Sequence, residues 1–173
     1  MKKLLVCLLA LCALTFTSCN PDPEPEPINY ADDFVGEYVI SVTPSVISEK
    51  YGYIVNEYEG LLCKITETYT NNVSVSIYQG SSLVYRVGGS CDASGMRLGE
   101  SEFGFSLQEY VDGILVTLKG ESELGSVYVK KPIDGTLSWV APITSADIEF
   151  IIENIKVDAG TVTGSVAFEG ERI

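Results

Sequence analysis

The stretch EFGFSLQEYVDGILVTLKG, residues 102–120, contains two strand patterns on either side of one turn. Every second residue from Phe103 to Leu107 is apolar, which is the period of two expected of a half-buried strand. Asp112-Gly113 separates residues 102–111 from residues 114–120, and both turn residues accept the positive φ angles of a two-residue hairpin. We therefore expect an antiparallel hairpin here.

The same alternation recurs along the rest of the chain. Apolar and polar residues alternate after Tyr38, after Val73 and again after Val162. Turn-forming sequences such as Asn71-Asn72 and Asp134-Gly135 interrupt these runs at short intervals and leave about nine or ten candidate strands. The pattern predicts an all-β, antiparallel up-and-down meander.

The edges of such a sheet need protection, and closing the sheet on itself removes them. Residues 30–173 have the length of a single domain and suffice for a small barrel of about eight strands. A two-sheet β-sandwich fits the same alternation and remains the alternative.

One segment has two interpretations. Ser145-Ala146-Asp147 could cap a helix that continues to Ile155, with isoleucines at helical spacing. The same residues also alternate in the strand period, and their β-branched content favours a strand. We expect Asp158-Ala159-Gly160 to join this strand to the last one, which starts at Thr161, as a second hairpin.

Residues 1–18 resemble a bacterial lipoprotein signal peptide: a short cationic start, an apolar run and small residues directly before Cys19. The apolar run is too short for a transmembrane helix. The resemblance implies that the chain is cut before Cys19 and that this cysteine carries the lipid that attaches the protein to a membrane. Residues 19–29 would then be the lipidated cysteine and an acidic, proline-rich tether.

The acidic residues that follow Cys19 are similar to the export tags of Bacteroidetes surface lipoproteins. This similarity implies a lipid-anchored protein of the bacterial outer membrane, displayed on the cell surface or kept on the periplasmic leaflet. Removal of the leader takes away two of the 11 basic residues and none of the 24 acidic ones, which leaves a net charge of −15. Such a charge repels nucleic acid, so we expect no nucleic-acid partner.

The chain contains no histidine. This excludes Ser-His-Asp and Cys-His nucleophilic sites and histidine-ligated zinc or copper. Paired glutamates such as Glu100 and Glu102 are better explained as surface charge than as an acid and base pair. We expect no catalytic residues, no metal and no cofactor.

Two cysteines, Cys63 and Cys91, lie within strand-like sequence of the exported domain. An oxidising compartment permits a disulfide between them. Two buried free thiols that pack as small apolar groups are the alternative.

Gly36-Glu37-Tyr38 opens the first strand directly after the linker, where lipocalins place Gly-x-Trp. Together with the glycine-rich meander and the closing residues 160–166, this resembles the calycin-like lipoproteins of Bacteroidetes. The resemblance implies a calycin-like barrel, and the leading hypothesis is a non-enzymatic module that binds a hydrophobic or amphipathic small molecule. The candidate ligand-lining residues are Tyr38, Phe103, Phe105 and Trp139.

The alternative function is a structural or interaction lipoprotein. The chain is rich in tyrosine, and residues 51–59 contain three of them, Tyr51, Tyr53 and Tyr58. Tyrosines on an outer surface could contact a glycan or another envelope protein, although tyrosine also suits the half-exposed face of any strand.

Overall fold

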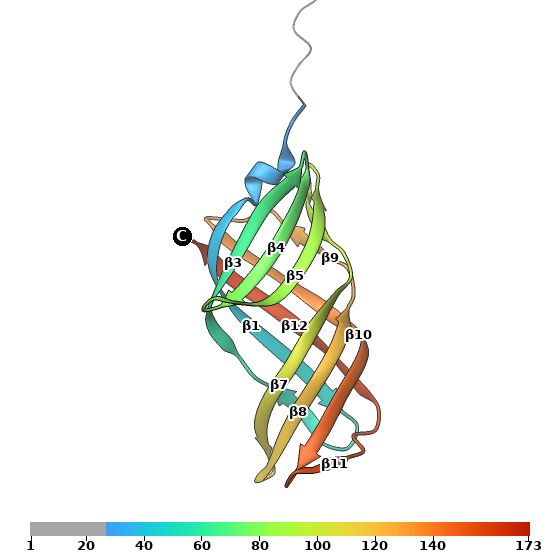
Figure 1. Ribbon diagram of the computed structural model, residues 1–173. Helices are drawn as coiled ribbons and strands as arrows, with labels where there is room; N and C mark the ends of the chain where they lie inside the picture. Colours follow the sequence, from blue (N-terminus) through green and yellow to red (C-terminus); the bar gives the residue numbers. More distant parts are fainter. Residues whose placement is uncertain (1–26) are drawn as a thin grey trace, which may run out of the picture.

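The computed structural model describes residues 27–173, which form one antiparallel β-sheet curled into a half-barrel (Figure 1). This confirms the predicted fold class. A short 3-10 helix, η1 (Tyr30–Asp33), precedes the strands. The strands are β1 (Gly36–Ser48), β2 (Gly52–Val55), β3 (Tyr58–Tyr69), β4 (Asn72–Gln79), β5 (Ser82–Cys91), β6 (Gly95–Leu98), β7 (Ser101–Val111), β8 (Ile114–Leu124), β9 (Val127–Lys130), β10 (Thr136–Ile152), β11 (Ile155–Val157) and β12 (Val162–Arg172).

The predicted signal peptide, Cys19 and most of the tether lie outside the described residues. Asn29, placed at the end of the tether by the sequence, belongs to the folded part. Its side chain donates to Glu67 (2.9 Å) and accepts a hydrogen bond from the backbone of Asn71 (3.2 Å). The chain therefore enters the domain at the end of the molecule where η1 and the β3–β4 turn lie (Figure 1).

The strand order is β7-β8-β10-β12-β1-β3-β4-β5-β6-β9, with β11 on β10 and β2 on β1. Chain neighbours are mostly sheet neighbours, as in a meander, and β12 returns to pair with β1. Twelve strands form where about eight were expected, because β1 and β10 each add a short hairpin partner and the four-residue strands β6 and β9 form a further short pair. Within the described residues β7 and β9, at the two ends of the order, pair on one side only, so the ladder does not close.

The hairpin predicted from residues 102–120 is present. Val111 pairs with Ile114, and Asp112 and Gly113 take φ angles of 50° and 82°. The alternation of β7 is also as expected, since Phe103, Phe105 and Leu107 are buried while their neighbours face outward.

The ambiguous segment after Ser145 is a strand, the second half of β10, and its predicted hairpin is wrong. Residues 136–142 of β10 pair with β12, whereas residues 143–152 pair with β8, and a bulge between Ile143 and Ser145 marks the change of partner. Glu153 and Asn154, with φ angles of 50° and 65°, turn the chain before Asp158 is reached. The hairpin partner of β10 at that end is the short strand β11.

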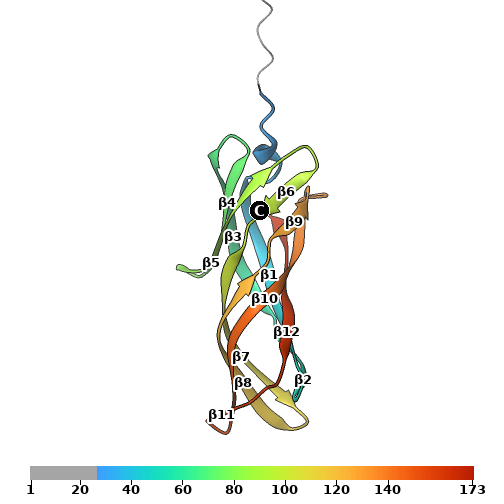
Figure 2. The ribbon, with the colours of Figure 1, turned by 90° about the vertical axis from the view of Figure 1, so that its right-hand side faces the viewer.

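The molecule is elongated along the strands (Figure 2). η1 covers one end, and the β7–β8 and β10–β11 hairpins form the opposite end. Inside, aromatic rings fill the middle of the curled sheet: Trp139 stacks on Phe168 (4.6 Å between ring centroids), and Phe168 contacts Tyr85 (5.2 Å). Among the described residues no helix is long and apolar enough to cross a membrane.

Candidate functional site

The two halves of the sheet meet along β5 and β7 without a ladder of backbone hydrogen bonds. The Gly99 amide donates to the Gly88 carbonyl (3.0 Å) next to the start of β7. Beyond this bond, residues 83–88 of β5 and residues 101–106 of β7 each have one edge that pairs with no other strand in the described part of the chain. We call the gap between these two segments the seam.

Tyrosine side chains link β7 to its neighbours across the seam. The Tyr85 hydroxyl shares a hydrogen bond of 2.9 Å with the Ser101 hydroxyl, and the Tyr58 hydroxyl donates to the Ser106 carbonyl at 2.9 Å. Ser101 and Ser106 lie five positions apart on β7, so the two links hold the strand near both ends of this segment. Between them the sheet remains open.

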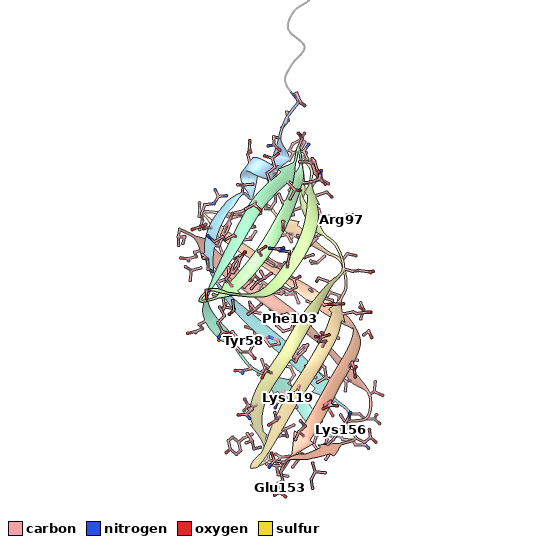
Figure 3. The ribbon with its side chains drawn as sticks, in the orientation of Figure 1. Tyr58, Arg97, Phe103, Lys119, Glu153 and Lys156 are labelled. Atoms are coloured by element: carbon pink, nitrogen blue, oxygen red, sulfur yellow. The ribbon has the colours of Figure 1, made fainter. Side chains whose placement is uncertain are left out.

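A cavity of about 330 Å³ occupies this opening. We call it the seam cavity. Five strands, β1, β3, β4, β5 and β7, each contribute one residue to its buried floor. The residues at its rim are more exposed. Figure 3 shows Tyr58 and Phe103 at mid-height, between the η1 end and the tip marked by Glu153. The floor residues are Val42, Leu61, Ile77, Tyr85 and Phe103, and the rim residues are Tyr58, Gln79, Val84, Gly104 and Ser106.

The polar groups in this lining are neutral. Burial raises the pKa of Tyr58, and burial also raises the pKa of Tyr85 against the opposing effect of its hydrogen bond to Ser101. Both phenols therefore keep their protons at neutral pH. Gln79 and Ser106 add an amide and a hydroxyl at the rim, and no charged side chain from residues 27–173 lines the cavity.

Of the four candidate ligand-lining residues, only Phe103 lines the seam cavity. Phe105 lies behind it, edge-on to the Phe103 ring at 5.1 Å between centroids. Trp139 is stacked in the aromatic core on Phe168, and Tyr38 lies at the η1 end. Phe105, Trp139 and Tyr38 therefore do not line the seam cavity.

Sequence reasoning missed most of the lining. Tyr58 and Gln79 each lie at the end of a strand, and Gly104 occupies an exposed position on the outer face of β7. A glycine within a strand often marks a bulge, a bend or a site where a ligand or another backbone approaches closely. That signal was present at Gly104, but the partner strands were not predictable from it.

Tyr38 belongs to a polar cluster that closes the η1 end. Its hydroxyl donates to the Phe34 carbonyl (2.8 Å) and accepts from the Arg172 guanidinium (2.9 Å). Arg172 also donates to the carbonyls of Asp33 and Val35. Burial raises the pKa of Tyr38, and the Arg172 hydrogen bond opposes this shift.

Cys63 and Cys91 are both buried and free, which matches the second of the two alternatives, a pair of buried thiols without a disulfide. Cys63 is in register with Ile77 of β4, and Ile77 is in register with Tyr85 of β5. Cys91 lies six residues further along β5, about 20 Å at the rise of a strand. A disulfide needs the two Cα atoms within about 7 Å of each other. Burial raises the pKa of the Cys63 thiol from 9.0 to about 12, so this thiol is inert at neutral pH.

The residues predicted to form a tyrosine surface are not gathered in one place. The Tyr51 ring stacks on Phe150 (6.0 Å between centroids), and Tyr58 lines the seam cavity. The most exposed tyrosines come from separate strands: Tyr53 from β2, Tyr69 from β3, Tyr110 from β7 and Tyr128 from β9.

Two buried polar atoms have no hydrogen-bond partner within residues 27–173, the Ser122 hydroxyl and the Trp139 indole nitrogen. Neither residue lines the seam cavity. In the same part of the chain no cluster of three or more cysteines and carboxylates is arranged to bind a metal ion.

Comparison with known proteins adds no assignment: no family model, no curated protein and no solved structure matches this chain.

Proposed function

We propose that the protein is a lipid-anchored, non-enzymatic binding protein of the bacterial outer membrane, and that the seam cavity takes a small apolar or amphipathic molecule. The cavity itself carries this proposal. It is apolar at its floor, open at its rim and bordered by a few neutral polar groups, which is the usual make-up of a small-molecule site.

The volume limits the ligand. At roughly 30 Å³ for a water-sized group, a cavity of about 330 Å³ accommodates about ten methylene-sized units. This fits one short alkyl chain or a two- or three-ring aromatic molecule. It is too small for a lipid with two long acyl chains.

The closed η1 end supports the calycin-like resemblance. Arg172, from the end of β12, lies over Tyr38, from the start of β1, at the position where the resemblance places the aromatic residue of Gly-x-Trp. The anchor remains a proposal that rests on the sequence around Cys19. Incorporation of radiolabelled palmitate that is abolished by Cys19→Ala tests it, and protease treatment of intact cells tests surface display.

Binding is tested with N-phenyl-1-naphthylamine, a neutral aromatic probe whose fluorescence rises in apolar surroundings. Val84→Trp places a large ring on the cavity rim, and Val39→Trp is the matched control, because Val84 and Val39 are 44% and 46% exposed and Val39 does not line the cavity. We expect Val84→Trp to weaken probe binding at least tenfold and Val39→Trp to leave it unchanged.

The tryptophan in Val84→Trp can stack on the aromatic probe and so bind it, and the test therefore includes a second rim variant without an aromatic ring. An added Cβ at Gly104 meets no atom within 4 Å, so Gly104→Leu extends into the mouth of the cavity with little strain. Equal probe binding by the native protein and by both rim variants would contradict the proposal, and so would an absence of probe binding by the native protein.

A further inference from the structure

We propose that the seam cavity selects its ligand by charge: it binds a neutral or cationic amphiphile and rejects an anionic one. The polar group of the bound ligand extends through the seam to the outer surface, beside Glu102 and Glu121. This inference rests on the proposed function and adds the chemical class of the ligand and its route of entry.

The route is defined by a second hollow on the outer side of the seam. The seam cavity and this outer hollow share three lining residues, Val84, Tyr85 and Gly104, so the two spaces adjoin across the gap between β5 and β7. Gly104 presents no side chain there, and the space that its Cβ would enter is empty. A ligand whose apolar body lies against Phe103 can therefore place its polar end in the outer hollow.

The charges in the outer hollow are predominantly negative. Glu102 and Glu121 line it, and among the residues that the structure describes Arg86 is the one cationic residue in its lining. The Arg86 side chain is turned toward β4, where its Nε donates to the Ser76 hydroxyl at 3.2 Å. This hydrogen bond leaves the Arg86 charge in place, but the two carboxylates outnumber it, so among the described residues the lining carries a net charge of −1.

Most of the neighbouring charged residues are also acidic, although Lys119 lies opposite the rim residue Ser106 in the β7–β8 ladder. Glu123 lies directly opposite Glu102 in the β7–β8 ladder, and Asp147 lies opposite Glu121 in the β8–β10 ladder. Within the described residues none of these four carboxylates forms a salt bridge. Like charges at directly opposed positions destabilise a sheet, and a cation placed among them relieves that repulsion.

The seam cavity does not compensate an anion for the loss of its hydration. None of the described residues lines it with a charged side chain, so an anionic group drawn inside would lose its water without gaining a counter-charge. The chain as a whole has a formal net charge of −13, which lowers the local concentration of anions and raises that of cations.

The test uses three competitors with the same eight-carbon chain, a length that the cavity volume accommodates: octyltrimethylammonium, 1-octanol and octanoate. Each is titrated below its micelle concentration against bound N-phenyl-1-naphthylamine at low salt. We expect octyltrimethylammonium to compete at least as well as 1-octanol, and octanoate to compete at least tenfold more weakly than either. The difference should shrink at 0.5 M salt, where the Debye length falls to about 4 Å.

Matched charge variants locate the effect. Glu102→Gln with Glu121→Gln removes two charges at the outer hollow, and Glu169→Gln with Glu171→Gln removes two exposed charges from β12, outside both hollows. Only the first pair should bring octanoate within about threefold of 1-octanol.

The outcomes separate this inference from the proposed function. A probe that does not bind overturns the proposed function. If the probe binds and all three competitors displace it equally, the proposed function stands and the charge selection is wrong. If octanoate competes best and Arg86→Gln abolishes its advantage, the hollow is an anion site and the inference is overturned.

Discussion

The Arg172 guanidinium lies 5.3 Å from the centroid of the Tyr38 ring and donates a hydrogen bond of 2.9 Å to its hydroxyl. Residue 172 ends the last strand and residue 38 lies in the first, so this contact joins the two ends of the folded chain. The β1–β12 ladder runs beside it, with Tyr38 opposite Arg172 in register. The contact therefore secures the pairing between the first and last strands.

Arg172→Ala should lower the free energy of unfolding by about 1–2 kcal/mol, because it removes hydrogen bonds to the Tyr38 hydroxyl and to two carbonyls at the η1 end. Arg172→Lys should recover only part of this loss, since a lysine lacks the planar fork that reaches several acceptors. Urea denaturation measures both. Arg97→Ala, at an exposed position of β6, is the control and should change stability by less than about 0.5 kcal/mol. Equal losses for Arg172→Ala and Arg97→Ala would contradict the assigned role.

Thiol titration should find two free cysteines in the domain. In protein that starts at Asn20, purified without reductant and denatured in guanidinium, a thiol reagent should react with both Cys63 and Cys91. In the folded protein the same reaction should be slow, because both side chains are buried. A denatured sample with no reactive thiol would mean that a disulfide forms and that the β3–β4–β5 register is wrong.

Stability should fall at alkaline pH, beginning near pH 9. The Cys63 thiol has its pKa raised to about 12 by burial, so above pH 9 the unfolded chain loses this proton while the folded chain keeps it. The unfolded state then binds fewer protons than the folded state, and the free energy of unfolding decreases by up to about 1.4 kcal/mol per pH unit. Urea denaturation at pH 8, 9 and 10 measures the slope, and Cys63→Ala should reduce it. An unchanged slope in that variant would show that Cys63 does not cause it.

Gly170→Ala should destabilise the domain by about 2–3 kcal/mol, because the added methyl group has no space. It would lie 2.5 Å from the Val39 carbonyl and in direct conflict with the Ile40 side chain. Gly88→Ala is the control: it lies in strand β5 and its added Cβ meets no atom within 4 Å. Thermal or urea denaturation should show a loss for Gly170→Ala alone. A tolerated alanine at position 170 would mean that β12 lies further from β1 than described.

The sequence predicts those parts of the fold that depend on local pattern. Alternation over residues 102–111 and the positive φ angles accepted by Asp112-Gly113 specify the β7–β8 hairpin without reference to the rest of the chain. The strand character after Ser145 follows in the same way from its β-branched residues. In contrast, Glu153 in a left-handed conformation has no local signature, so the turn that ends β10 was placed five residues too late.

The site was less predictable, because it depends on which strands become neighbours. Phe103 was identified as a large apolar residue on an inward face, which any core position would satisfy. The lining contributed by Tyr58 and Tyr85 depends on how far the sheet curls and on a seam that no residue pattern encodes. Arg172 was missed for a similar reason, since its partner Tyr38 lies 134 positions away in the chain.

The seam opens on the flank of the molecule, at mid-height, and not at either tip. If the protein is attached to a membrane through the N-terminal side of the domain, the η1 end faces the membrane and the hairpin tips point away from it. The mouth of the seam cavity then faces parallel to the membrane surface, so a ligand can enter and leave from the side while the protein stays attached. A partner that binds the distant hairpin tips does not block this opening.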